Sequence, residues 1–334
     1  MLLDSTPPTR DPRRAVVTPR GTTARTPAEA SPLILPMPGG ELAPCHHDRC
    51  ADRLDGELSA LRTSLTEGPP AAYLPPSDET GLVRHRWRTG HHAALVVRQL
   101  QARALNALAA TPEAEARRLI VWTVALYDVH SVLFLYSGSC SPEQYAAVLR
   151  PGMMTAHPAF SAEWARDHAP VPIALRAAQD RHRACALDPL TRAVTHNQRV
   201  HTAVGRRLVA DGAAPLQWAG RRSGDGPTEA EHALADAHFG VARRPVCASV
   251  HRAQLVRLLT LCLADIGAHG LGPLPDGCPG RFGREAVSRL VAVAVAEEPP
   301  ACAAPLPQAP ALPALPPLPQ PHPTKPQPTK GRTT

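Results

Sequence analysis

Histidine is the residue type in this sequence with the greatest capacity for chemistry. The chain of 334 residues contains 16 histidines. Near neutral pH an imidazole can transfer a proton, or it can ligate a metal ion through one ring nitrogen. Most single histidines in proteins do neither, so the surroundings of each one decide which chemistry is open to it.

The segment VTHNQRVHTAVGRRLVADG at 194–212 is predicted to be helical, and its two histidines face different ways. Each residue of a helix advances about 100° around the axis. With Leu190 at 0°, His201 falls at about 20° and His196 at about 240°. The sequence therefore predicts that His201 faces the core and that the two cannot ligate one metal from this helix. The apolar stripe that surrounds His201 consists of Leu190, Val194, Val204 and Leu208.

A histidine inside an apolar stripe must still satisfy its ring nitrogens. A hydrogen bond to a backbone carbonyl is one solution. Ligation of a heme iron is the other, because heme takes one protein histidine on one side and an apolar pocket around the macrocycle. The residues alone leave both solutions open for His201.

A second histidine cluster, CHHDRC at 45–50, combines metal-binding residue types at close spacing. The His46-x-x-x-Cys50 spacing suits zinc or a covalently attached heme, but the segment has no second ligand pair nearby and matches no strong zinc pattern. The pair His182 and Cys185 is a weaker signal of the same kind. The eight cysteines of the chain are scattered, and this is typical of reduced thiols in a cytosolic protein.

Helical patterns recur through the middle of the chain and predict an all-α fold. The run 119–136 is apolar nearly all round and predicts a buried central helix that ends at Ser137-Gly138. No alternating strand-like runs appear. Helices are predicted around Leu54–Leu65, at 91–110 with a new start at Thr111-Pro112-Glu113, from Ser141, and at 171–186, 188–211, 228–239, 249–266 and 283–298.

Composition predicts one helical domain between two proline-rich ends. Residues 1–40 and 299–334 lack hydrophobic periodicity, and we expect both to be disordered. The domain then spans 41–298. The tails carry most of the net charge of +7, so the domain itself is close to neutral. This distribution argues against a nucleic-acid partner, which would require basic residues on folded elements.

The sequence shows no recognisable targeting signal. The start MLLDSTPPTRDPRR has an acid and prolines where a signal peptide has an apolar stretch, and no run approaches 18 apolar residues. We therefore expect a cytoplasmic protein without a membrane partner. The oligomeric state stays open, a homo-oligomer included.

Three segments in the same order resemble the tryptophan 2,3-dioxygenase superfamily of heme enzymes. VHTAVGRRLVADGAAP at 200–215 resembles the helix of the proximal histidine, and GHHAALVVRQLQARALNAL at 90–108 resembles the distal helix. FLYSGSCSPEQYAAVLR at 134–150 resembles the turn and short helix that end in a carboxylate-binding arginine. The arginine- and alanine-rich chain with proline-rich ends is most similar to the heme-dependent tyrosine hydroxylases of actinobacterial antibiotic pathways.

The resemblance implies a role for each of these segments. His201 would ligate the iron of a dissociable heme b, with His196 as the alternative ligand. His92 or His91 would be the distal acid–base catalyst, and Arg150 would bind the substrate carboxylate. The implied reaction is hydroxylation of free L-tyrosine ortho to the phenol, with hydrogen peroxide as oxidant, in secondary-metabolite biosynthesis.

Two other functions remain open at the level of sequence. A heme indole oxygenase that acts on L-tryptophan would use the same residues. A helical binding or regulatory protein without a cofactor would instead satisfy its histidines with backbone carbonyls. A Soret absorption band in the purified protein separates both heme enzymes from the binding protein.

Overall fold

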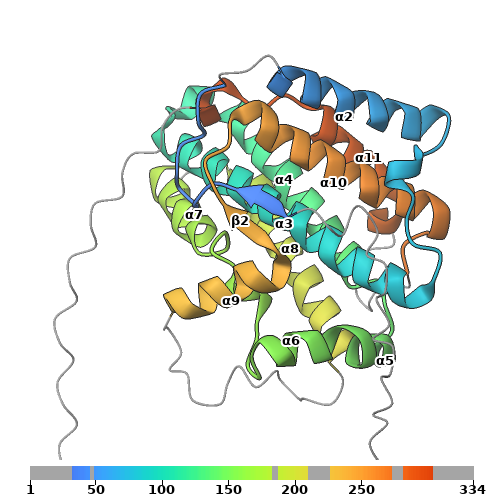
Figure 1. Ribbon diagram of the computed structural model, residues 1–334. Helices are drawn as coiled ribbons and strands as arrows, with labels where there is room; N and C mark the ends of the chain where they lie inside the picture. Colours follow the sequence, from blue (N-terminus) through green and yellow to red (C-terminus); the bar gives the residue numbers. More distant parts are fainter. Residues whose placement is uncertain (1–31, 46–48, 183–186, 210–225, 273–280, 304–334) are drawn as a thin grey trace, which may run out of the picture.

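A computed structural model of the chain confirms the all-α fold class (Figure 1). It describes residues 32–45, 49–182, 187–209, 226–272 and 281–303. A short parallel pair of strands, β1 (Leu33–Leu35) and β2 (Val241–Arg243), accompanies the helices. The described helices are α2 (Arg49–Thr66), α3 (Glu79–Ala110), α4 (Ala116–Ser137), α5 (Pro142–Gln144), α6 (Arg150–Ala156), α7 (Pro170–Arg181), α8 (Asp188–Leu208), α9 (Glu229–Phe239), α10 (Ala248–His269) and α11 (Arg281–Val295).

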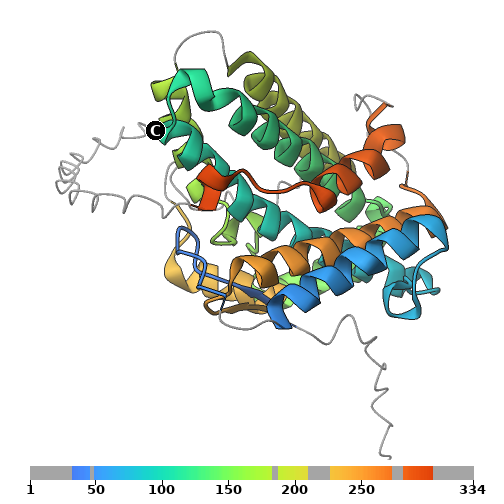
Figure 2. The ribbon, with the colours of Figure 1, turned by 90° about the horizontal axis from the view of Figure 1, so that it is seen from above.

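The long helices α3 and α4 form the centre of the fold. They pack on each other, α7 and α10 cover further faces of α3, and α8 and α11 cover α4. Figure 2 shows α2 alongside α10, on the far side of α3 from α8. Helix α4 and the turn before it are long and apolar enough to cross a membrane, but most of the segment is buried inside the protein, as predicted for a central helix.

Glycine allows α3 and α4 to approach closely beside the two neighbouring histidines of α3. A Cβ at Gly90 would lie 2.1 Å from the Ser137 Oγ, closer than any real contact. Gly138, just past the end of α4, plays the same part against α8, because a Cβ there would lie 2.5 Å from the Val204 side chain. The close packing of three helices thus depends on two residues without side chains.

The helix boundaries agree with the sequence patterns where capping residues set them. Ser141 and Thr228 each form a capping box, with Gln144 and Glu231. The helix predicted at 91–110 ends as expected, but it begins twelve residues earlier, where the Asp78 carboxylate accepts a hydrogen bond from the Gly81 N–H. The cap expected at Thr111 was wrong: its hydroxyl donates to the Ala107 carbonyl, and α4 starts only at Ala116.

The core extends beyond both boundaries predicted for the tails. Leu33 and Leu35 of β1 are buried, although they fall in the segment 1–40 that was predicted to be disordered. At the other end Cys302 is buried, in the turn Pro300–Ala303, within the predicted tail 299–334. Three-residue elements carry too little periodicity to be read from sequence. Residues 1–31 and 304–334 lie outside the described residues.

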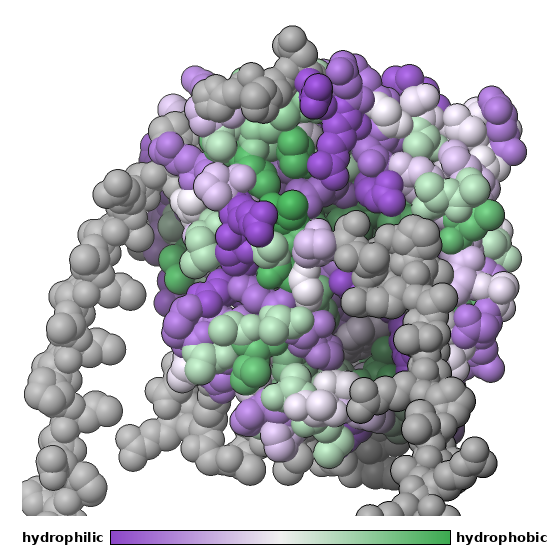
Figure 3. Space-filling view, in the orientation of Figure 1, coloured by the Kyte–Doolittle hydropathy of each residue, from purple (hydrophilic) through white to green (hydrophobic). Residues whose placement is uncertain are grey.

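The face seen in the orientation of Figure 1 carries both hydrophobic and hydrophilic residues. Hydrophobic residues appear there in small patches between hydrophilic ones, as Figure 3 shows for the part that is not covered in grey.

Replacing Leu35 by alanine tests whether the segment before α2 belongs to the core. Leu35 is fully buried, so the variant should lose about 2–5 kcal/mol of unfolding free energy. The matched control is Leu74→Ala, at a position that is 59% exposed, which should change stability by less than about 0.5 kcal/mol. Equal denaturation midpoints for the two variants would show that β1 does not contribute to the core.

Candidate heme site between α3, α4 and α8

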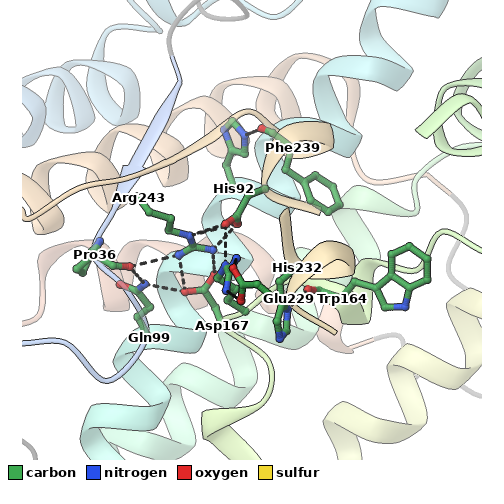
Figure 4. A network of polar contacts seen from close by, with 11 residues as sticks. Pro36, His92, Gln99, Trp164, Asp167, Glu229, His232, Phe239 and Arg243 are labelled. Carbon is green, nitrogen blue, oxygen red and sulfur yellow. Dashed lines mark hydrogen bonds and ion pairs between the residues drawn. The ribbon is translucent and has the colours of Figure 1, made fainter. Parts of the chain in front are cut away.

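A buried ion-pair network fixes the segments around the candidate site (Figure 4). The Arg243 guanidinium of β2 donates to two carboxylates, Asp167 at 2.7 Å and Asp236 of α9 at 2.6 Å. Asp167 also accepts from the Gln99 side-chain amide of α3 at 2.6 Å. Arg166 pairs with Asp236 at 3.1 Å. Three regions that are distant in sequence, in α3, before α7 and at α9–β2, therefore share one set of charges.

The two neighbouring histidines of α3 have different environments. His92 is buried, and its Nε2 lies 2.5 Å from the Phe239 carbonyl (Figure 4). A carbonyl only accepts, so His92 donates from Nε2 and helps to hold the end of α9. The Nδ1 of His91 lies 2.7 Å from the Trp87 carbonyl, one turn earlier in α3. His91 therefore carries its proton on Nδ1, and its Nε2 is a lone-pair acceptor.

Four histidines from separate segments lie near one another, and we call them the histidine cluster: His91, His130, His168 and His201. His201 lowers the pKa of each of the other three by charge repulsion, in addition to the larger effect of burial. Burial brings the pKa of His91 to about 4. All four are consequently neutral near pH 7, the form in which an imidazole binds a metal.

His201 lies at the edge of the buried stripe of α8, and the prediction that it faces the core was wrong. Its side chain is exposed, whereas Asn197 and Val200 are buried. The predicted stripe included Leu190, Val204 and Leu208 correctly but was centred about 40° too far round the helix. His201 thus flanks the stripe on one side and His196 flanks it on the other.

The exposed His201 side chain contacts α4. Its ring stacks on Phe134 with 4.5 Å between centroids. Desolvation by the surrounding protein lowers its pKa, Glu163 raises it, and the Arg98 charge lowers it further. His196 has a different neighbour, the Asp128 carboxylate of α4, whose pKa it lowers against a larger upward effect of burial.

The packing of α4 on α8 sets the relative positions of two cluster histidines. His130 contacts Asn197, and one turn further along both helices Phe134 contacts His201. The Asn197 amide nitrogen lies 3.1 Å from the His130 Nδ1 and donates to it, so the His130 proton is on Nε2. That Nε2 is buried and has no partner among the described residues. An unmatched buried donor costs about 1–3 kcal/mol, which an acceptor from a ligand or water would recover.

Arg98 brings a positive charge to the histidine cluster without a carboxylate bound to it in the described part of the chain. It lies two turns after His91 on the same face of α3. Burial lowers its pKa, which Tyr127 and Glu163 raise from a distance. Its Nε is buried and has no hydrogen-bond partner among the described residues, and Nη1 has a long contact of 3.4 Å with Gln101. A partly buried arginine of this kind is suited to an anionic group.

The histidine cluster does not have the geometry of a bare metal site. Among the described residues, three or more ligand atoms come within 4.8 Å of one another only in a group of three cysteines elsewhere in the fold. Histidines that do not converge on one point fit a larger group, to which one histidine contributes a ligand. Heme is a group of this kind, because it takes a histidine ligand at its iron and carries anionic groups.

Aromatic side chains are scarce in the chain but gather beside His91. The sequence has four Trp, four Tyr and four Phe, and five of them form one series of ring contacts around His91 and Phe239. His91 stacks on Phe239 at 4.8 Å and lies 4.1 Å from Trp87. The five are Trp87, Tyr145, Phe160, Trp164 and Phe239.

Arg150 begins α6 and is half-buried beside this aromatic group. Its charge lowers the pKa of the Tyr145 phenol, against a larger upward effect of burial. Tyr145 in turn contacts Trp87, the neighbour of His91. The structure therefore brings Arg150 to the aromatic side of the candidate site, whereas His201 is on the side of α4 and α8.

Three residues of the site were not identified from sequence: Arg98, His130 and His168. Two had a signal. Arg98 follows His91 by seven residues on a helix, which places both on one face. His130 interrupts an otherwise apolar helix, where a histidine needs a partner. His168 stands in a turn between helices, and its neighbours there come from distant segments. The weaker candidate His182 is buried and donates to the Leu108 carbonyl at 2.8 Å, while Cys185 lies outside the described residues.

The fold and the site together define an all-α protein in which neutral histidines, a partly buried arginine and a group of aromatic rings lie near one another. Residues 46–189 match the family described as SfmD 3-methyl-L-tyrosine peroxygenase. The matched segment covers less than half of the chain and contains His91, Arg98, His130, Arg150 and His168, but not His201. The match supports an oxidoreductase of the peroxygenase type, with a peroxide as oxidant. No curated protein matches the chain.

The stability of the protein should fall as the pH is lowered below the pKa of free histidine. Burial brings the pKa of His92 to about 4 and that of His251 to about 3. The unfolded chain, with histidine pKa values of about 6.5, therefore binds protons that the folded chain does not. The free energy of unfolding has its full value above about pH 6.5. It decreases between about pH 6.5 and 4, by about 1.4 kcal/mol per pH unit for each histidine.

Denaturant unfolding at a series of pH values measures this slope. A His251→Gln variant should show a shallower dependence, because the amide does not titrate. The matched control is His232→Gln, at a half-buried position, which should keep the wild-type slope. A wild-type unfolding free energy that is constant from about pH 7 to pH 4.5 would contradict the burial of these neutral imidazoles.

Proposed function

We propose that this protein is a heme-dependent peroxygenase that hydroxylates L-tyrosine or a ring-methylated tyrosine ortho to the phenol. The observation that carries the proposal is the histidine cluster, with Arg98 and the aromatic group beside it. The matched family, described as acting on 3-methyl-L-tyrosine, supports the substrate class. The helical fold and the order of the three segments that resemble the tryptophan 2,3-dioxygenase superfamily agree with it.

In this proposal the residues of the histidine cluster and Arg98 have separate roles toward heme. His201 would supply a nitrogen ligand to the iron, since it is neutral and accessible. Arg98 would pair with an anionic group of the heme, which would give its partly buried guanidinium an anion. When bound, heme would activate the peroxide and supply the oxygen atom that enters the aromatic ring.

His91 is the better candidate than His92 for proton transfer on the distal side. Its Nδ1 is held by the Trp87 carbonyl, so its Nε2 is an acceptor at neutral pH. A neutral imidazole with a lone pair can take the first proton of hydrogen peroxide and return it later. The Nε2 of His92 is bonded to the Phe239 carbonyl, and this favours a positioning role.

The substrate is placed by the aromatic group and by Arg150. The ring of a tyrosine packs on aromatic side chains such as Trp87 and Phe239. The carboxylate then binds the Arg150 guanidinium, which can form two parallel hydrogen bonds. The partner of the protein is accordingly a small aromatic amino acid. We also propose that the protein is cytoplasmic and that its heme is a dissociable heme b.

An indole oxygenase that acts on L-tryptophan is the alternative enzyme. A single assay separates it from the proposal. Purified protein with heme and hydrogen peroxide is given L-tyrosine, 3-methyl-L-tyrosine or L-tryptophan. Dihydroxyphenylalanine-type products from the first two support the proposal. Turnover of tryptophan alone would replace the substrate class, and a protein without a Soret band would be better described as a helical binding protein.

Replacing His201 by alanine should remove heme from the purified protein. The axial bond is the principal contact of the protein with the iron, so the variant should retain less than about a tenth of the wild-type heme. His196→Ala is the matched control on the same helix, and it should retain full heme because His196 is on the Asp128 side of α8. Heme content is measured by the pyridine hemochrome assay. Full heme in the His201 variant, or loss only in the His196 variant, would show that the ligand is misassigned.

Replacing Arg150 by lysine should weaken substrate binding without changing heme content. Lysine keeps the charge but loses the two-pronged contact, so KM should rise about tenfold, equivalent to about 1.4 kcal/mol. Arg62→Lys, on the exposed face of α2, is the control with unchanged kinetics. Steady-state kinetics over a range of tyrosine concentrations measure both variants. An unchanged KM in the Arg150 variant would remove this residue from the substrate site.

A further inference from the structure

Three cysteine thiols from two distant parts of the chain meet at the start of helices α2 and α10. The Sγ atoms of Cys45, Cys50 and Cys247 all lie within 4.8 Å of one another. Cys45 precedes α2, Cys50 is in its first turn, and Cys247 is the N-cap residue of α10. The backbone joins the two segments beside the thiols, because the Ala43 N–H donates to the Val246 carbonyl at 2.8 Å.

The meeting of the three thiols supplies a further ligand, which the sequence motif CHHDRC lacked. The segment 45–50 alone has two cysteines and no second ligand pair nearby, and Cys247 brings a third thiol from about 200 residues further along the chain. Residues 46–48 lie outside the described residues. The contact does not require an apolar cluster, since Cys45 is exposed and Cys50 is half-buried. Burial of hydrophobic surface therefore does not explain why the three thiols meet.

Three thiols at this separation repel one another once they lose their protons. The positive ends of two long helices, α2 and α10, point toward the group, as at many reactive or metal-bound thiolates. A divalent cation would remove the repulsion between further thiolates.

We propose that Cys45, Cys50 and Cys247 bind a structural zinc ion that joins the start of α2 to the start of α10. Zinc–sulfur bonds of about 2.3 Å in a tetrahedron place the sulfur atoms about 3.8 Å apart, so the thiols are already close to a ligand arrangement. Binding releases one proton from each thiol that is not yet ionised and changes no oxidation state. The three cysteines are separate from the histidine cluster, and the proposal is independent of the proposed function.

Metal analysis of the full-length protein tests this site. The protein is purified under reducing conditions with zinc in the growth medium, dialysed, and analysed for zinc and iron by mass spectrometry. We expect about one zinc per chain in the wild type, whatever the iron content, and at least a fivefold loss of zinc in Cys45→Ser. Because Cys45 is exposed, this variant should still fold. The matched control is Cys140→Ser, a buried cysteine outside the group, which should retain zinc.

A second measurement identifies the ligand atoms. Cobalt(II) in place of zinc should give thiolate-to-cobalt charge-transfer absorption and the visible bands of a tetrahedral site, both absent in Cys45→Ser. Equal zinc in Cys45→Ser and the wild type would overturn the proposal. So would wild-type protein without zinc, or an intact mass that is two hydrogens lower because two of the three cysteines form a disulfide.

Discussion

The arrangement of the site depends on the Arg243 guanidinium and the two carboxylates that it joins. Asp167 precedes His168 in the turn before α7, and Asp236 is on α9 one turn before Phe239. Through Gln99 the same network reaches α3 and His251 of α10. Burial acts to lower the pKa of Arg243, but the two acids raise it instead, so the charge stays in place. Removing one partner of such a group costs about 3–5 kcal/mol. Here it would also release α9, which carries Phe239, from α3, which carries His91.

A second constraint is that no carboxylate is bound directly to the histidine cluster or to Arg98 in the described part of the chain. The cluster histidines meet carbonyls, an amide and aromatic rings, and Arg98 has no bound carboxylate in the described part of the chain. Burial then keeps the imidazoles neutral and leaves a guanidinium and a buried N–H group unmatched. Such a set costs stability. In the proposed function heme would recover that cost, because it offers one ligand position for an imidazole and anionic groups for the arginine.

The sequence predicted the helical elements better than it predicted the site. Long amphipathic or apolar runs determine α3, α4, α8 and α10, because helix periodicity is local. Orientation within a helix was less secure: Asn197 is buried against His130, and because this polar residue was left out of the apolar stripe, the predicted centre of α8 lay too close to His201. The grouping of His168 with His91, and of Cys247 with Cys45, comes from tertiary packing between segments that no local pattern connects. The short strand Leu33–Leu35 was assigned to the leader for the same reason, since its partner is β2.

The most direct test of the central claim is the origin of the oxygen atom that enters the substrate. Heme-loaded protein is given L-tyrosine and its 3-methyl derivative with hydrogen peroxide labelled with oxygen-18, under unlabelled dioxygen. The account predicts that the added hydroxyl carries oxygen-18 in nearly every product molecule. An unlabelled product would place the oxygen source in dioxygen or water and contradict a peroxygenase. Heme-loaded protein that forms no hydroxylated product from either amino acid would contradict the proposed reaction.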